Sequence, residues 1–380
     1  MASTCKKRFA EFTHEEIVEK RQKTVPISTV RANKKAQNLL DSYVQEKGLP
    51  VIDYHNITAP KLDEILSKFY LEARTTAGDY YKTASIQNFR HGINRLLNSP
   101  PYNRDIDIIK GPEFHESCNT YVTAVRELKS MGKGEVKHYP EIEPADLKKI
   151  YASMNNNSPQ ALALKVQFDI RFFFCRRGAE NLYGMNKNTF VIKINSSGEE
   201  YVSLVAGTLD KNHSENDKEM WGAFMPARPD SNKCPVKSFK TMLSKLHPQC
   251  DSLWQRPRLI FSENDDIWFS NSRLGQKTLA SFMPYVSKNI TLSQLYTNHS
   301  VRTTGITALN RSHFGQKQIM AVSGHKSLSS LAIYERVSDR EKMAMGHAMA
   351  DALSENPQGK FKKKKSKIGL HLLFLLIKVY

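Results

Sequence analysis

Four residues in the last quarter of the sequence have side chains suited to phosphate chemistry: His299, Arg302, His325 and Tyr334. His299 and Arg302 are three residues apart, so on a helix their side chains would lie on one face. A guanidinium beside an imidazole can bind a phosphate and also transfer a proton. The phenol of Tyr334, whose ordinary pKa is about 10, becomes a nucleophile only with cations and a base nearby. The stretch therefore predicts a site where a bound phosphate is attacked by a tyrosine.

The order of these residues resembles the signature of the tyrosine recombinases, which is His-x-x-Arg, then Gly-His, then Tyr nine residues later. Residues 323–336, Ser-Gly-His-Lys-Ser-Leu-Ser-Ser-Leu-Ala-Ile-Tyr-Glu-Arg, are similar to Crypton-type transposon recombinases and to domesticated proteins derived from them. Each short motif alone is weak evidence, because an isolated His-x-x-Arg is more often a solvated helix face. The complete set, in this order and at these spacings, is specific.

The resemblance also implies an arginine motif upstream. Residues 175–182, Cys-Arg-Arg-Gly-Ala-Glu-Asn-Leu, match the first arginine motif of the family in the form Arg-x-x-Glu-x-Leu. Arg177 is then the first phosphate-binding arginine, and Glu180 is the acid that supports the site. Arg176 competes for the same role, but the spacing to Glu180 favours Arg177.

A general acid is implied after a predicted β-hairpin. The family carries a lysine on a hairpin loop at this point, and residues 208–213 read Thr-Leu-Asp-Lys-Asn-His. Lys211 is the preferred candidate because this run resembles the Crypton-type sequence, and Lys218 is the alternative. The gap between Arg177 and Lys211 is longer than in the bacterial enzymes, which makes this assignment less secure than the others.

In the family, a tyrosine attacks one DNA strand and forms a 3′-phosphotyrosine, which a 5′ hydroxyl of a partner strand then reverses. The covalent link conserves the bond energy, so the resemblance implies neither a cofactor such as ATP nor a metal. The implied roles are nucleophile for Tyr334, phosphate binding for Arg177 and Arg302, base or positioning for His299, phosphate hydrogen bonding for His325, and proton donation to the 5′ oxygen for Lys211.

Other functions compete with a site-specific recombinase or integrase. The main alternative is a domesticated DNA-binding protein that keeps the fold while its chemistry is unused. A type IB topoisomerase fits less well, because that family has a lysine or similar residue where His299 stands. A metal-dependent DDE integrase ranks lower still, because no acidic triad stands out in the sequence.

The composition agrees with a large DNA-binding protein. A chain of 380 residues with 40% hydrophobic content suits two globular domains. The net charge of +18 favours a polyanionic partner, most simply double-stranded DNA. The five cysteines, Cys5, Cys118, Cys175, Cys234 and Cys250, are odd in number and widely spaced. This spacing argues against a disulfide framework or a zinc site, and for a reducing compartment.

The hydrophobic pattern predicts an α+β chain that is mostly α-helical with a small β-hairpin. Residues 1–27 are expected to form a flexible basic arm, charged from the start and without a signal peptide. Residues 28–130 predict four amphipathic helices, near 30–44, 62–70, 85–97 and 114–128, and resemble the core-binding domain that clamps DNA in this family. The candidate phosphate contacts in that domain are Arg74, Lys82, Arg90, His91 and Arg95.

A linker at residues 131–142 is expected to lead into a catalytic domain at residues 143–353. Pro144, Ser158-Pro159 and Pro235 mark helix starts, and the helix after Ser158 should be the buried central one. A further helix is expected to begin just after Phe174. The remaining predictions are a hairpin from strands 190–194 and 201–205, a short strand at 259–261, and helices at 275–288, after Ser327 and at 339–353.

The tail at residues 354–380 combines a lysine run with an apolar end. Residues 360–367 are nearly all lysine, which is typical of a nuclear import signal or a DNA-phosphate arm and predicts the nucleus. Residues 368–380 are apolar but too short for a bilayer, which needs about 20 residues. No membrane association is therefore expected. The family assembles as a tetramer on DNA and often passes a C-terminal helix to a neighbouring protomer, so we expect a homo-tetramer on DNA.

Overall fold

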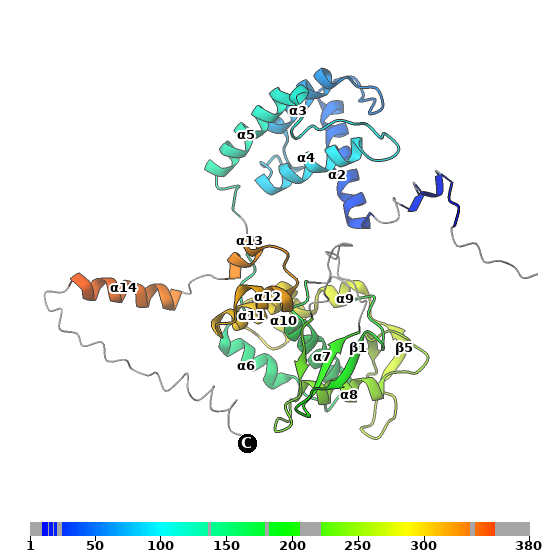
Figure 1. Cartoon of the computed structure of the whole chain (residues 1–380), viewed down its shortest axis with the longest axis vertical. Helices are drawn as coiled ribbons and strands as arrows, with labels where there is room; N and C mark the ends of the chain where they lie inside the picture. Colours follow the sequence, from blue (N-terminus) through cyan, green and yellow to red (C-terminus); the bar gives the residue numbers. More distant parts are fainter. Residues whose placement is uncertain are drawn as a thin grey trace, which may run out of the picture. The chain divides into compact units, whose positions relative to one another are not determined.

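The computed structural model describes residues 10–13, 15–17, 19–20, 25–135, 138–178, 182–205, 222–334 and 339–353. The chain divides into two compact units, Met1–Lys137 and His138–Tyr380 (Figure 1). The predictions for the lysine run and the apolar end of the tail lie outside the described residues. Among the residues that are described, no helix is long and apolar enough to cross a membrane.

The first unit is helical, as predicted from its hydrophobic periodicity. Its helices are α2 (Ile27–Glu46), α3 (Ala59–Glu72), α4 (Thr83–Leu97) and α5 (His115–Ser130), the last preceded by the 3-10 turn η1 (Pro112–Phe114). Helix α2 packs on α4, and α3 packs on α5. The first pair approaches closely at Gly92, where a Cβ atom would lie 2.8 Å from the Cβ of Ala36. One apolar core, which includes Leu40, Leu62 and Phe69, joins the helices.

The second unit is built around α7 (Pro159–Phe173), which is buried along most of its length. Ser158 caps this helix by accepting a hydrogen bond from the amide of Ala161, as its sequence predicts. Helices α6 (Pro144–Ser153) and α8 (Pro235–Lys245) begin at the prolines that predict them. The predicted hairpin is present as β1 (Phe190–Ile194) and β2 (Glu200–Leu204), which are antiparallel, with β3 (Met225–Pro226) added beside β2.

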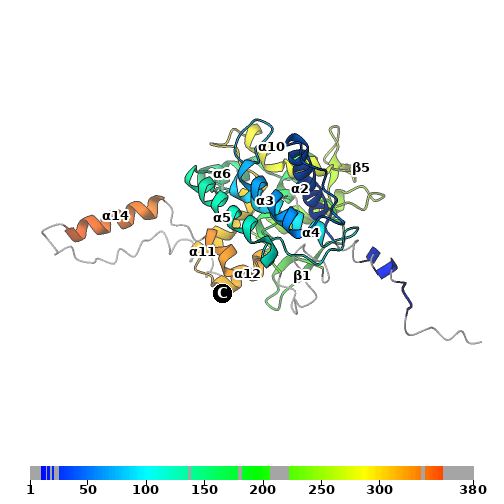
Figure 2. The same ribbon diagram turned by 90° about the horizontal axis from the view of Figure 1, so that it is seen from above.

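The other elements of the second unit follow in chain order. A second small antiparallel sheet pairs β4 (Gln255–Pro257) with β5 (Phe269–Arg273). The helices after it are α9 (Gln276–Ala280), α10 (Phe282–Asn289), α11 (Asn298–Arg311), α12 (Gln316–Ser323), α13 (Leu328–Leu331), the 3-10 turn η2 (Ala332–Tyr334) and α14 (Asp339–Leu353). Helices α11 and α12 lie side by side, and α11 carries His299 and Arg302 (Figures 1 and 2).

Two predictions about this part of the chain are wrong. The strand expected at residues 259–261 does not form, because Leu259 and Ile260 are 87% and 93% exposed and the ladder of β4 ends at Pro257. The single helix expected at residues 275–288 is broken at Ser281. Pro284 has no amide hydrogen to donate, and the carbonyls of Leu279 and Ala280 accept from the side chain of Asn298 instead.

The helix expected just after Phe174 does not begin in residues 175–178, the described part of this stretch. Residues 174–178 form an irregular turn in which Cys175 and Gly178 have φ angles of 45° and 38°. These left-handed angles do not continue a helix. The turn bends the main chain toward α11, so the arginines that follow Phe174 are placed by a turn and not by a helix.

Candidate active site

Helix α11 positions His299 and Arg302 near its N-terminal end. The amide of Thr297 donates to Oγ of Ser300 at 3.3 Å there, next to the first helical residue, Asn298. The side chain of Arg302 is only 4% exposed. Its guanidinium donates to the carbonyl oxygen of Cys175, and to that of Ser323 at 2.8 Å. The cation is therefore held in one orientation by main-chain acceptors from two other segments.

His325 lies against this guanidinium at the end of α12. The preceding residue, Gly324, has a left-handed conformation with a φ of 69°, which ends the helix and turns the chain back. Nε2 of His325 lies 3.0 Å from Nη2 of Arg302, and Nδ1 lies 2.7 Å from Oγ of Ser323. Because a guanidinium can only donate, the ring nitrogen facing it has to be unprotonated.

The electrostatics favour the same neutral imidazole. Burial, together with the nearby charges of Arg302 and Arg177, lowers the pKa of His325 to about 4. Both effects act against the charged form of the ring. His325 is therefore neutral at pH 7 in the absence of a bound anion.

Arg177 reaches the same place from the turn after α7. Its Nη2 donates to the carbonyl oxygen of Gly324 at 3.4 Å, and its charge acts on both Arg302 and His325. Arg176, the competing residue, is buried, and its amide donates to the carbonyl oxygen of Arg171 at 3.0 Å. The structure thus brings Arg177 together with Arg302 and His325.

Tyr334 completes the cluster from η2. Ser327 caps α13 just before it, as predicted, by accepting from the amide of Ser330. The ring centroids of Tyr334 and His325 are 5.4 Å apart. Burial lowers the pKa of Arg302, and the neighbouring phenol of Tyr334 partly offsets this effect. The tyrosine also packs against a small apolar group that includes Ile306.

His299 lies at the edge of the arginine turn. Its Nε2 would be 2.8 Å from a Cβ atom placed on Gly178, so only glycine leaves room for the imidazole there. Its ring stacks on Tyr139 with a centroid distance of 4.5 Å and an interplanar angle of 13°.

Glu180, Lys211 and the alternative Lys218 lie outside the described residues.

The candidate DNA contacts of the first unit differ in their surroundings. Arg90 is only 8% exposed and donates to the carbonyl oxygens of Ile108 and Ile109, so its guanidinium belongs to the interior and is not offered to DNA. This prediction fails because α4 turns that position toward the core. Lys82 and Arg95 are exposed, and His91 is half-buried.

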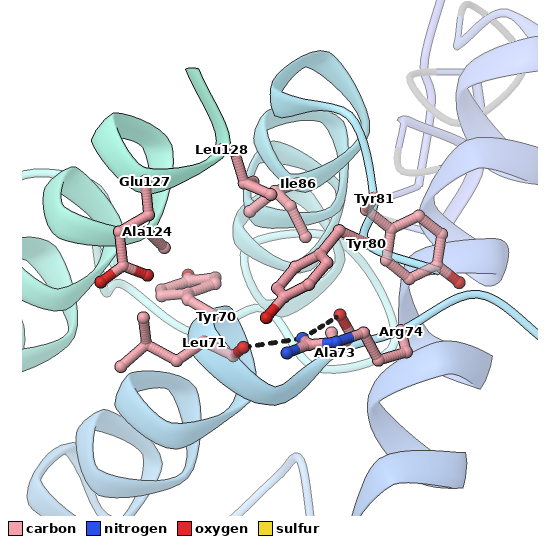
Figure 3. A pocket seen from close by; sticks show the side chains of 10 residues that line it. All are labelled: Tyr70, Leu71, Ala73, Arg74, Tyr80, Tyr81, Ile86, Ala124, Glu127 and Leu128. Carbon is pink, nitrogen blue, oxygen red and sulfur yellow. Dashed lines mark hydrogen bonds between the residues drawn. The ribbon is translucent and has the colours of Figure 1, made fainter. Parts of the chain in front are cut away.

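Arg74 lines a pocket of the first unit, where neighbouring groups contact its side chain (Figure 3). Its guanidinium lies 3.7 Å from the ring centroid of Tyr80 and donates to the carbonyl oxygens of Leu71 and Ala73. The side chain remains partly exposed. Arg74 can therefore reach a phosphate only by keeping or exchanging these contacts.

Several supporting residues were not predicted from the sequence. Asn298 is buried and its amide group donates to the carbonyl oxygen of Gly178 at 3.2 Å, which joins the arginine turn to α11. Ser323 orients His325, and its place directly before the Gly-His pair could have indicated this role. Cys175 contributes only a main-chain oxygen, which any residue type provides, so no sequence signal could have identified it.

The described residues hold no group of three or more His, Cys, Asp or Glu side chains that could bind a metal ion. No protein-family model matches the sequence, and no curated protein matches it.

The chain does resemble solved structures. The XerH site-specific recombinase, bound to a palindromic difH substrate in a post-cleavage complex, aligns with a TM-score of 0.50 and 15% identity over 88% of this chain and 83% of its own. The Tn1549 transposon integrase in complex with transposon right end DNA gives 0.45, with 11% identity over 88% and 98%. A lambda integrase dimer bound to a COC′ core site gives 0.43, with 14% identity over 86% and 94%. The predicted fold class is confirmed, and the chain has the mostly helical fold, with small antiparallel sheets, of the tyrosine recombinases.

Proposed function

We propose that this protein is a site-specific DNA recombinase or integrase that cleaves and rejoins DNA through a 3′-phosphotyrosine. One observation carries the proposal, namely the convergence of Arg177, Arg302, His325 and Tyr334 from four separate segments. Packing alone does not require two guanidinium groups next to a histidine and a tyrosine, because bringing like charges together is costly. An anion bound between them would relieve that cost.

The two arginines would bind the non-bridging oxygens of the scissile phosphate. Arg302 is fixed by the carbonyl oxygens of Cys175 and Ser323, so it does not have to reorganise when negative charge develops on the phosphate. Donors that are oriented in advance stabilise a transition state more than mobile donors do. Arg177 is less buried and would bind the phosphate from the turn after α7.

His325 would donate to the phosphate after taking up a proton. Without DNA its ring is neutral and accepts from Arg302. A phosphate between the two arginines would cancel part of their positive field and raise the pKa of the imidazole. Phosphate binding and protonation of His325 are then coupled.

In the chemical step, Oη of Tyr334 would form a bond to phosphorus as the bond from phosphorus to the 5′ oxygen breaks. The phenolic proton would pass to His299, which acts as base or positioning group, and Lys211 would protonate the departing 5′ oxygen. Reversal by the 5′ hydroxyl of a partner strand would rejoin the DNA. The assignments of Lys211 and Glu180 rest on the sequence motifs.

The test is to trap the covalent intermediate. A binding site is first selected from a random duplex library, and duplexes nicked at successive positions across it are then offered to the full chain. A nick just downstream of the cleaved bond lets the short fragment that carries the released 5′ hydroxyl diffuse away, so the protein should remain attached to the upstream strand in SDS. We expect the adduct to vanish in Tyr334→Phe, and to form about 100- to 1000-fold more slowly in Arg302→Ala.

Tight binding to the selected site with no adduct at any nick position would count against the recombinase. It would favour a domesticated DNA-binding protein of the same fold. Tyr334→Phe keeps the ring that packs on Ile306, so its loss of adduct would report the missing hydroxyl and not a loss of folding.

The finer assignments are proposals as well. We propose assembly as a homo-tetramer on DNA, which light scattering with and without the selected duplex can test. A Crypton-type origin and a nuclear location, directed by the lysine run at residues 360–367, rest on sequence resemblance and composition. Deletion of that run from a fluorescent fusion should abolish nuclear accumulation.

A further inference from the structure

Residues 138–143, the segment that begins the second unit, are bound to α11 by a hydrogen bond and an ion pair. The amide of Ile142 donates to Oγ1 of Thr304 at 2.8 Å, and Glu141 forms a two-pronged ion pair with Arg311 at 2.7 and 2.9 Å. Thr304 and Arg311 belong to the helix that also carries His299 and Arg302. The position of this segment is therefore tied to the helix of the candidate active site.

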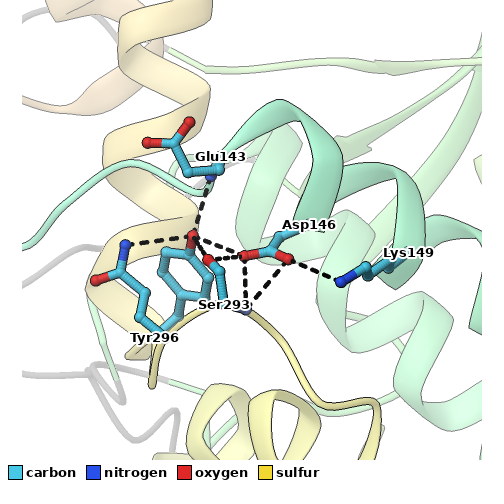
Figure 4. A network of polar contacts seen from close by, with 6 residues as sticks. Glu143, Asp146, Lys149, Ser293 and Tyr296 are labelled. Atoms are coloured by element: carbon cyan, nitrogen blue, oxygen red, sulfur yellow. Dashed lines mark hydrogen bonds and ion pairs between the residues drawn. The ribbon is translucent and has the colours of Figure 1, made fainter. Parts of the chain in front are cut away.

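A buried polar network holds the other side of the same segment (Figure 4). The amide of Glu143 donates to the phenol oxygen of Tyr296 at 3.2 Å, and that phenol donates to Asp146 at 3.0 Å. Ser293 also donates to Asp146, and the hydrogen bonds from Ser293 and Tyr296 hold the pKa of this carboxyl below its usual range. The network joins α6 to the loop that leads into α11.

Tyr139 extends from this fastened segment onto the imidazole of His299. The two rings are nearly parallel, at 13°, with centroids 4.5 Å apart. Tyr139 is still 48% exposed, so the contact with His299 is not part of an apolar core. The Nε2 atom of the same imidazole lies against Gly178, and the carbonyl oxygen of Gly178 accepts a hydrogen bond from Asn298. The ring of His299 is thus confined on one face and on one edge.

We propose that Tyr139 is a positioning residue for His299. Its ring keeps the imidazole plane in one orientation, and the segment fastened to α11 keeps Tyr139 in register with the site. The inference rests on the proposed function, in which His299 receives or directs the phenolic proton of Tyr334. It adds a residue from the segment that begins the second unit, and no motif of the sequence pointed to it.

The first test observes the stack directly and does not need DNA. In the full chain with ring-labelled histidine, His299 is assigned from the signal lost in His299→Gln. Stacking should shift its ring protons upfield, and the shift should disappear in Tyr139→Ala but remain in Tyr139→Phe. An unchanged His299 signal in Tyr139→Ala would overturn the inference.

The second test measures adduct formation on the nicked duplex. We expect Tyr139→Ala to slow it by about 10- to 100-fold, as a misplaced catalytic group does, and Tyr139→Phe to be close to wild type. Tyr285→Ala removes another exposed tyrosine of the same unit and should have no effect. In a His299→Ala background, Tyr139→Ala should cost little more, because both changes remove the same contribution.

The outcomes separate the two proposals. Absence of an adduct with the wild-type chain overturns the proposed function and this role with it. Normal wild-type activity with an equally active Tyr139→Ala, or an undiminished effect of Tyr139→Ala in the His299→Ala background, overturns the positioning role alone.

Discussion

Nε2 of His325 lies 3.0 Å from the guanidinium of Arg302, in a contact that only a neutral imidazole can make. The pair joins the end of α12 to the N-terminal part of α11, next to the ring of Tyr334. Burial and the charges of Arg302 and Arg177 lower the pKa of this histidine to about 4. The positive charge of the candidate site is therefore carried at pH 7 by the two arginines and not by the histidine.

The first prediction concerns stability against pH. The unfolded chain binds a proton at this histidine near its ordinary pKa of about 6.5, whereas the folded chain does so only near pH 4. The unfolded state thus holds more protons between these two pH values. The free energy of unfolding should therefore be highest above pH 6.5 and should decrease as the pH falls toward 4. Urea unfolding of wild type and His325→Gln from pH 7 to 4 should show a smaller loss in the variant. Parallel curves would contradict the lowered pKa.

The second prediction concerns proton uptake on DNA binding. A phosphate between Arg177 and Arg302 should raise the pKa of His325, so affinity should increase as the pH falls from 7 to 5. Titration calorimetry in buffers of different ionisation enthalpy should detect up to about one proton taken up at this site. His325→Gln is the control and should take up correspondingly less. Equal uptake by both proteins would rule out His325 as the group that titrates.

The third prediction is that each chain cleaves with its own tyrosine. The phenol of Tyr334 acts on Arg302 of the same chain. A mixture of Tyr334→Phe with Arg302→Ala should therefore form the adduct on the nicked duplex no faster than Arg302→Ala does alone, since neither chain holds a complete site. Recovery of a large part of the wild-type adduct in the mixture would instead mean that a neighbouring copy supplies the tyrosine.

The fourth prediction uses a matched pair of glycines. Gly178 and Gly198 both have positive φ angles, 38° and 80°, but a Cβ atom at Gly198 meets nothing within 4 Å, whereas at Gly178 it would lie 2.8 Å from Nε2 of His299. Each alanine substitution should lower the free energy of unfolding by about 1 kcal/mol or more through backbone strain. Only Gly178→Ala should slow adduct formation, by about 10- to 100-fold. Equal rates in the two variants would mean that His299 is not confined by this turn.

The fifth prediction separates two arginines of α4. Arg90 donates to buried carbonyl oxygens, so Arg90→Met should lower the free energy of unfolding by about 1.5–3 kcal/mol. Arg95 is exposed, so Arg95→Gln should change the free energy of unfolding by less than about 0.5 kcal/mol. If Arg95 contacts a phosphate, its loss should weaken binding to all sequences and reduce the salt slope by about one unit. An unchanged slope would remove Arg95 from the DNA surface.

Local patterns in the sequence determined most of the helices. Ser158 and Ser327 cap helices, and Pro144 and Pro235 start them, because each choice is decided by bonds within one turn. The same holds for the β-hairpin, whose two strands are separated by a short turn. The spacing of Arg302, His325 and Tyr334 singled out three side chains that lie together in the structure, and their catalytic roles stay a prediction.

Only the tertiary structure decided which side chains are buried and what holds the site. Whether Arg90 faces solvent depends on segments far away in the chain, and the pattern of α4 alone did not distinguish it from Arg95. Leu259 and Ile260 have the composition of a strand but no partner strand. The contact between Tyr139 and His299 joins residues that are far apart in the sequence. Such contacts arise from the packing of whole elements, which no local spacing of residue types encodes.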